Sequence, residues 1–154
     1  MWRDGVGVAI RRVEVYTPAR VARTHFLESL VTPQGRAASL MVDRPTGQVP
    51  LATTVEAAFD SESRRRGLLG RPSLPRGTAL VIAPSNGVHT FFMKFAIDIA
   101  FADRDGRVVK ITRGVKPWRV ALARSGFAVI EMAAGTFDRV GLARGDRLRV
   151  TPVR

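Results

Sequence analysis

The side chains best suited to chemistry lie close together in one stretch of the chain, residues 89–111. Within ten positions this stretch has a histidine, a methionine, a lysine and an aspartate: His89, Met93, Lys94 and Asp98. An aspartate can act as a general base and a lysine can stabilise developing negative charge. The histidine has two interpretations: it caps the core with one nitrogen hydrogen-bonded, or it lies at the polar mouth of a cavity. The stretch is therefore the first candidate for a functional site.

Side-chain alternation along an extended strand sorts this stretch into two faces. The odd positions of residues 91–101 are all large and apolar, which predicts a core face where Met93 packs rather than binds a metal. The even positions combine Lys94 and Asp98 with alanines, which predicts a strand, loop or ligand close above them. In an unbroken strand Lys94 and Asp98 lie about 13 Å apart. A bulge or turn near Ala96 would bring them together.

Metal chemistry has little support in the sequence. His25 and His89 are the two histidines and there is no cysteine, which argues against histidine and thiolate metal sites and rules out disulfides. Asp103, Asp105 and Gly106 resemble a calcium loop only superficially, because the glycine comes too early and no glutamate closes the loop. The Asp-Gly pair predicts a hairpin turn instead. No cofactor or metal is expected.

Glu131 is a carboxylate inside the apolar run of residues 127–134. Alternation places it on one strand face with Val129, so it has apolar neighbours. A buried charge needs a partner or must be neutralised, and the sequence offers Arg71 or Lys94 as that partner. Because removing one member of a buried pair costs about 3–5 kcal/mol, Glu131→Ala is expected to destabilise the protein strongly.

The elements that position these groups are predicted to be short strands between glycine and proline breaks. A turn at residues 44–47 joins two of them. One helix is expected within residues 60–70, with Asp60 or Ser61 as its N-cap and Gly67 and Gly70 at its end, and a second short helix within residues 136–146. The expected fold is mainly β: a compact antiparallel β-barrel or sandwich with one or two short helices.

The chain of 154 residues suits one domain with an extension. Residues 1–37 are expected to form an N-terminal extension or arm, because Pro18, Pro33 and Gly35 interrupt its apolar runs. Residues 38–154 are expected to form a single β-rich globular domain.

The net charge is +12, from 25 basic and 13 acidic residues. Such a charge attracts nucleic acid, anionic lipid or acidic partners. The phenylalanines follow core parity, so stacking aromatics on a basic surface are not expected, and any nucleic-acid binding should be weak and non-specific. No segment has the length of a signal-peptide core or a membrane helix, so no membrane insertion and a cytoplasmic location are expected.

Three segments, in this order and spacing, resemble the family called domain of unknown function 192 (DUF192), or uncharacterised protein family 0127. They read "GLLGRPSLPRGTALVIAP", "VHTFFMKFAIDIAFADRDGRVVKI" and "VIEMAAGTFDRVGLARGD", and the resemblance spans about residues 38–150. Family positions fall on Arg64, Gly67, Leu68, Leu69, Arg71, Val88, His89, Thr90, Met93, Lys94, Ile97, Asp98, Ile130, Glu131, Ala134, Gly135, Gly145 and Asp146. The resemblance implies a compact β-rich fold with short helices and no established activity.

Two departures from the family pattern stand out. Ala96 occupies a position where many relatives have proline, and Ser85 and Asn86 stand where close relatives often have a cysteine before the His-Thr pair. A role that needs this thiol is not expected here.

The sequence as a whole predicts a non-catalytic binding module for a small polar or anionic ligand or a partner protein. The candidate binding residues are Arg71, His89, Thr90, Lys94, Asp98 and Glu131. One alternative is a hydrolase-like enzyme that uses Glu131 or Asp98 as general base with Lys94, which requires two of these groups within hydrogen-bond reach in a concave site. The other alternative is non-specific nucleic-acid binding.

Overall fold

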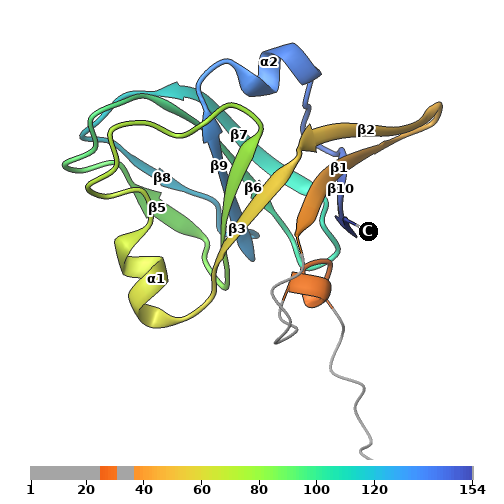
Figure 1. Ribbon diagram of the computed structural model, residues 1–154, viewed down its shortest axis with the longest axis horizontal. Helices are drawn as coiled ribbons and strands as arrows, with labels where there is room; N and C mark the ends of the chain where they lie inside the picture. Colours follow the sequence, from red (N-terminus) through yellow and green to blue (C-terminus); the bar gives the residue numbers. More distant parts are fainter. Residues whose placement is uncertain (1–24, 31–36, 154) are drawn as a thin grey trace, which may run out of the picture.

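The computed structural model describes residues 25–30 and 37–153 (Figure 1). Most of the expected N-terminal extension, residues 1–24 and 31–36, lies outside the described residues. The elements are, in chain order, η1 (Glu28–Leu30), β1 (Ala38–Arg44), β2 (Gly47–Ala52), β3 (Thr54–Ala58), α1 (Ser61–Arg66), β4 (Thr78–Ile82), β5 (Gly87–His89), β6 (Ile97–Ala102), β7 (Val108–Val115), β8 (Val120–Leu122), β9 (Ala128–Ala133), α2 (Thr136–Val140) and β10 (Arg147–Pro152).

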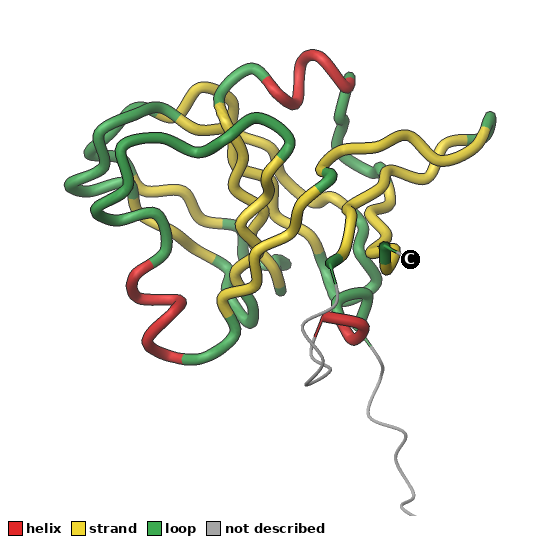
Figure 2. Tube along the Cα trace, in the orientation of Figure 1, coloured by secondary structure: helices red, strands yellow, loops and turns green. Residues whose placement is uncertain are grey.

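The strands form a five-stranded sheet in the order β3-β4-β9-β6-β7, a three-stranded sheet in the order β10-β1-β2, and the two-stranded pair β5-β8. Strands therefore dominate the described chain, and the helices are single short turns at its periphery (Figure 2). The mainly β class is confirmed. A closed barrel or a sandwich is not confirmed, because the strands of the described segments form separate open sheets.

One strand pair departs from the expected antiparallel pattern. β3 and β4 run parallel, with Thr54 opposite Thr78 and Ala58 opposite Ile82. Parallel neighbours need a crossover connection rather than a tight turn. Residues 59–77 provide it, and they include α1 and the loop that follows α1. This crossover places α1 beside the central sheet, where it can form one wall of a pocket.

Both faces of the five-stranded sheet are buried, and each has its own apolar cluster. In β6, Ala100 and Ala102 belong to the cluster that includes α2, β1 and β10, whereas Ile97, Ile99 and Phe101 belong to the cluster beneath the loop after α1. The alternation predicted for this strand is therefore confirmed over residues 97–102. The small alanine face is covered by Phe137 and Leu142, among others.

The helices begin and end as their sequences indicate. Asp60 caps α1, and its side chain accepts hydrogen bonds from the backbone N–H groups of Glu62 and Ser63 at 2.9 and 2.8 Å. Gly67, with φ 47°, follows the last helical residue. The second helix, α2, lies within the expected range and occupies its first five residues.

Residues 25–30 pack against the domain although they belong to the expected arm. Leu27 is fully buried, and the N–H of Phe26 donates to the carbonyl of Arg104 at 3.0 Å. The boundary at residue 38 stays a prediction, but this short piece of the arm adds to the core. Within the described residues, no helix has the length and apolar character that spanning a membrane requires.

Candidate functional site

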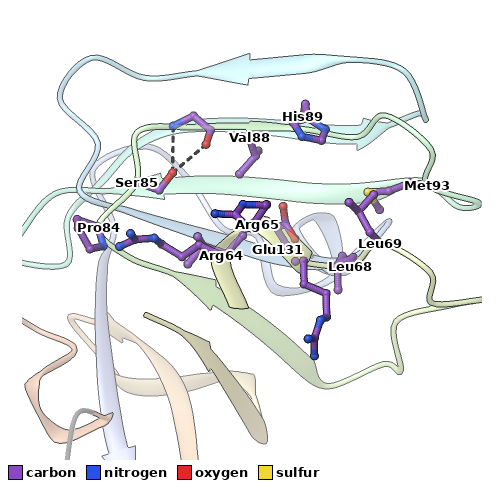
Figure 3. A pocket seen from close by; sticks show the side chains of 14 residues that line it. Arg64, Arg65, Leu68, Leu69, Pro84, Ser85, Val88, His89, Met93 and Glu131 are labelled. Carbon is purple, nitrogen blue, oxygen red and sulfur yellow. Dashed lines mark hydrogen bonds between the residues drawn. The ribbon is translucent and has the colours of Figure 1, made fainter. Parts of the chain in front are cut away.

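A pocket of about 310 Å³ lies between α1 with its following loop and the strands β4, β5 and β9 (Figure 3). Its apolar lining comes from Leu68, Leu69, Ile82, Val88 and Met93. Its polar lining comes from the arginines Arg64–Arg66 and from Ser85, His89 and Glu131. A hollow with apolar side chains and converging polar groups is the usual form of a small-molecule site, and here the polar share is large.

Glu131 projects from β9 into this pocket, between Val88 on one side and Leu68 and Leu69 on the other (Figure 3). The side chain is almost fully buried, and no described residue donates a hydrogen bond to its Oε2 atom. Burial raises the pKa of Glu131 from 4.5 to about 7, and the positive charge of Arg71 opposes this rise. The carboxyl is therefore largely protonated below neutral pH and can donate or accept a hydrogen bond.

Arg71, the expected partner, binds another carboxylate. Its guanidinium makes two hydrogen bonds to Glu56 on β3, at 3.2 and 2.7 Å, and these hydrogen bonds raise its pKa. Among the described residues Glu131 has no ion pair, so the expected buried pair with Arg71 or Lys94 is wrong. Removing Glu131 leaves no partner charge stranded, and the strong destabilisation predicted from pair breaking loses its basis.

The arginines of α1 give the pocket its positive charge. Arg64 donates to the carbonyl of Phe59 at 3.3 Å, and Arg66 forms an exposed ion pair with Glu62 at 2.5 Å. Arg65 is exposed and forms no hydrogen bond or ion pair with another described residue. An anionic group at the mouth of the pocket would therefore meet one unengaged guanidinium next to two that are held in place.

Asp98 is buried on the opposite face of the sheet from Glu131 and lines neither wall of this pocket. Its two oxygens accept hydrogen bonds from the backbone N–H groups of Gly114 at 2.8 Å and Phe137 at 2.9 Å. The first contact holds a bulge in β7, and the second satisfies an N–H in the first turn of α2. Asp98 therefore has a structural role, and its oxygens are not available to act as a base.

Thr90 is also a structural residue. Its hydroxyl donates to the carbonyl of Lys116 at 2.8 Å and accepts from the N–H of Arg119 at 3.0 Å. Its backbone bonds to Arg119 and Trp118, at 2.9 and 3.0 Å. Thr90 thus ties the chain after β5 to the loop between β7 and β8, away from the pocket.

His89 lies at the end of β5 and lines the pocket, as the cavity-mouth interpretation predicts. Its ring stacks on Phe91, with centroids 4.9 Å apart, and its Nδ1 accepts from the Phe91 N–H at 3.3 Å. Of the predicted binding residues, the structure brings His89 and Glu131 into one pocket. Arg71 lies outside it but acts on Glu131 through its charge.

Lys94 is exposed and does not meet Asp98. The predicted strand begins only at Ile97, because residues 91–96 form turns, with Phe92 at a φ of 63°. This break does not bring the two groups together, since Asp98 points into the core. Met93 is buried in the cluster beneath the loop after α1, which confirms packing. Asp103 closes the β6–β7 hairpin by accepting from the N–H groups of Asp105 and Arg107, as predicted.

Sequence reasoning missed most of the pocket wall that α1 supplies. Local patterns in the sequence did not indicate that Arg65, Arg66, Ile82 or Ser85 would line a pocket. One signal was available: of the five family-motif positions in this region, Arg64, Gly67, Leu68, Leu69 and Arg71, all but Arg71 line the pocket.

Comparison with known proteins identifies the family of the chain. The family model of DUF192, described as "Uncharacterized ACR", matches residues 41–150. A protein from Thermococcus sibiricus described as "UPF0127 protein" is 29% identical over 108 residues, which cover 67% of this chain and 66% of that protein. The chain thus matches about two thirds of the length of this curated relative.

Two solved structures share the fold. One, a protein of unknown function from Novosphingobium aromaticivorans, has 23% identity and a TM-score of 0.64, over 72% of this chain and 83% of that one. The other, from Sinorhizobium meliloti and described as a "putative transcription regulator", has 24% identity and a TM-score of 0.65, over 75% and 95%. The matched segment 41–150 contains every residue that lines the Glu131 pocket, and this chain is a member of the DUF192 family.

Proposed function

We propose that the protein is a small-ligand binding module whose site is the Glu131 pocket. The observation that carries the proposal is the Glu131 carboxyl in the pocket lining, whose buried Oε2 has no hydrogen-bond donor among the described residues. A buried polar atom without a partner is costly, and such atoms in native proteins call for an explanation such as a bound group. A ligand that hydrogen-bonds to Glu131 would remove this cost.

The lining defines the chemical class of the ligand. The arginines of α1 favour a carboxylate or phosphate at the mouth, Glu131 favours a hydroxyl or amine at depth, and Leu68, Val88 and Met93 favour a short apolar body between them. The ligand is therefore a small hydroxy- or amino-substituted anion. A volume of about 310 Å³ admits a compact molecule rather than a polymer.

A thermal-shift screen of small hydroxy-carboxylates, amino-carboxylates and phosphorylated alcohols tests this proposal. A ligand at a hundred times its Kd stabilises the native state by about 2.7 kcal/mol, which raises Tm measurably. We expect Glu131→Ala and Arg65→Ala to weaken the response to the best compound. Arg76→Ala is the control, because Arg76 is exposed and lines no part of the pocket. A screen in which no compound stabilises the wild type, or in which Arg65→Ala and Glu131→Ala respond fully, would contradict the proposal.

The hydrolase-like alternative has weaker support. Asp98 is engaged by two backbone N–H groups, Lys94 is exposed, and neither lines the pocket with Glu131. The hydroxyl of Ser85 is bonded to the carbonyl of Gly87 at 2.8 Å rather than to a base. What favours catalysis is the Glu131 pKa of about 7, which suits a general acid or base. Conversion of any ligand found in the screen, with loss of turnover in Glu131→Gln, would support it.

A further inference from the structure

An exposed apolar strip lies on β8 and the turns beside it, outside the Glu131 pocket. Within the described residues, four of the five exposed large apolar side chains belong to it. Their exposed fractions are 71% for Phe92, 55% for Trp118, 57% for Val120 and 61% for Leu122. Figure 1 shows β5 and β8 together at the side of the molecule away from β1, β2 and β10. Patches of this kind usually mark a binding surface.

The strip is continuous. Phe92 and Trp118 meet edge to face with ring centroids 4.6 Å apart, and the rings of Trp118 and Phe91 are 5.8 Å apart. Val120 pairs with His89 across β8 and β5, and Leu122 lies over Gly87, where an added Cβ would come within 2.4 Å of its Cδ2 atom. Aromatic rings therefore occupy one end of the strip and aliphatic side chains the other.

The two exposed rings are held in a strained conformation. Phe92 and Trp118 have φ values of 63° and 64°, and no other described non-glycine residue has a positive φ. Such conformations persist when the surrounding structure enforces them, and they concentrate at functional sites. Here the enforcing residue is Thr90, whose carbonyl accepts from the N–H groups of both Met93 and Trp118. The backbone thus holds two aromatic rings in solvent, where they do not pack against the protein core.

A cationic groove of about 380 Å³ adjoins the strip between β7 and β8, and Val120 and Arg119 belong to its lining. Its charged lining residues are Lys110, Arg113, Lys116 and Arg119. Residues 106–130 contain six lysines and arginines and no acidic residue. One of the four cations, Arg113, is paired with Asp138 at 2.8 Å, and Lys110 donates to the carbonyl of Leu122. The ammonium group of Lys116 has no hydrogen bond or ion pair to another described residue, since the hydrogen bond between Lys116 and Thr90 uses the backbone carbonyl of Lys116.

We propose that this strip and groove together bind single-stranded nucleic acid, with phosphates in the groove and bases stacked on Trp118 and Phe92. A groove of positive charge beside exposed aromatic rings is the arrangement by which proteins hold single strands without reading sequence. The sequence-based argument that the phenylalanines follow core parity expected no such rings. It is wrong for Phe92, which lies in a turn rather than in a strand.

Two other occupants fit less of the surface. An anionic membrane is flat, so it would contact the exposed strip while leaving the cations inside the groove without phosphates. An acidic peptide would satisfy the groove, but it offers no planar group at each step for the two fixed rings. A single strand supplies both a phosphate and a planar base for every nucleotide, whereas a duplex hides its base faces.

The chain itself provides the reporter for a test. It has two tryptophans, so a Trp2→Phe variant leaves Trp118 as the source of indole fluorescence. The full-length variant is titrated with a single-stranded oligonucleotide of about 12 nucleotides, within the usual site size. Parallel titrations use the matching duplex, polyglutamate, and vesicles of mixed neutral and anionic phospholipid. We expect saturable quenching with the single strand and affinity at least about tenfold lower for the duplex.

Variants divide the affinity into stacking and charge. Trp118→Ala should weaken single-strand binding about tenfold, while Trp118→Phe should retain most of it. Because these two variants lack the indole reporter, their affinity is measured by the fluorescence anisotropy of an end-labelled oligonucleotide, with the parent protein measured in the same way. If the four groove cations each meet a phosphate, affinity should fall about 50-fold between 50 and 200 mM salt. Lys116→Ala should make that dependence shallower, and the control Arg76→Ala should leave both quantities unchanged.

Equal affinity for single strand and duplex, or full affinity in Trp118→Ala, would overturn the proposal. Either result would show that the surface binds anions through its charge without stacking. Tighter binding to the vesicles or to polyglutamate than to the oligonucleotide would overturn it in favour of a membrane or an acidic peptide. None of these outcomes bears on ligand binding in the Glu131 pocket, whose floor and arginines remain intact in the strip and groove variants.

Discussion

The two faces of the central sheet each bury one carboxyl group, and the two groups are in opposite situations. Asp98 on β6 and Glu131 on β9 are separated by a single strand-to-strand step, since Asp98 pairs with Met132 and Ile99 with Glu131. Asp98 receives two backbone hydrogen bonds, whereas Glu131 has an oxygen without a donor and a pKa raised to about 7 by burial. Burial alone therefore does not distinguish a structural carboxyl from a binding one; the donors around it do.

The difference arises from the elements that cover each face. Over Asp98, the bulge in β7 and the start of α2 both turn unpaired N–H groups inwards. Over Glu131, the covering elements are α1 and the loop after it, whose leucines pack nearby but supply no donor to Oε2. On one face the backbone of the fold satisfies the hydrogen bonds of Asp98. On the other face Glu131 keeps an oxygen without a donor among the described residues, and its carboxyl lines a pocket.

The largest effect is expected from Asp98→Ala. This change removes the acceptor of the buried Phe137 N–H and of the Gly114 N–H, whose bond is partly buried, and a buried donor without an acceptor costs about 1–3 kcal/mol. We expect the free energy of unfolding to fall by about 3–5 kcal/mol in urea titrations. Asp98→Asn keeps one acceptor oxygen and should fall between this variant and the wild type. An Asp98→Ala variant with wild-type stability would show that the two bonds contribute nothing and would remove the contrast with Glu131.

A smaller effect of opposite sign is expected from Glu131→Gln. Because the pKa is 4.5 when unfolded and about 7 when folded, the native state binds the extra proton between these values. Stability is therefore greatest below pH 4.5, falls as the pH rises through 7, and is constant above that pH. The loss amounts to about 3 kcal/mol. Glu131→Gln cannot ionise, so it should match the wild type at acidic pH and exceed it by about that amount at pH 8.

Urea unfolding between pH 4 and pH 8 checks this prediction. Glu56→Gln is the control, because the Glu56 side chain is partly exposed and shows no such burial. The comparison with Asp98 would break down if the wild type lost no stability between pH 4.5 and 7, since Glu131 would then have a donor or solvent that keeps it charged.

The sequence allowed the hairpin at Asp103, the caps of α1 and the burial of Glu131 to be predicted, because each depends on neighbours a few positions away. Turn chemistry, capping and strand parity are local rules. They also placed Lys94 and Asp98 on one face. That prediction failed, because the strand starts at Ile97 and the preceding turn redirects every side chain before it.

Pairings between distant segments could not be predicted in this way. Arg71 forms its hydrogen bonds with Glu56 and not with Glu131. Asp98 accepts hydrogen bonds from the backbone N–H groups of Gly114 and Phe137, which are 16 and 39 positions away. The local sequence pattern does not indicate which cation or backbone N–H group lies next to a buried carboxyl in the folded protein. The α1 wall of the pocket was missed for the same reason, since it reaches the sheet through the parallel crossover between β3 and β4.

The smallest effect, and the sharpest test of how isolated Glu131 is, concerns Arg71. This guanidinium lowers the pKa of Glu131 through its charge alone, without a hydrogen bond. Arg71→Gln should therefore raise the Glu131 pKa above about 7, as seen in an NMR titration of its carboxyl carbon. The Arg71–Glu56 pair is partly exposed, so its loss should cost no more than about 1 kcal/mol. Glu56→Gln breaks the same pair but keeps the cation, and should not raise the Glu131 pKa. If both variants shift that pKa equally, the geometry of the pair rather than the charge of Arg71 controls Glu131, and Glu131 is less isolated from its surroundings than the contrast with Asp98 requires.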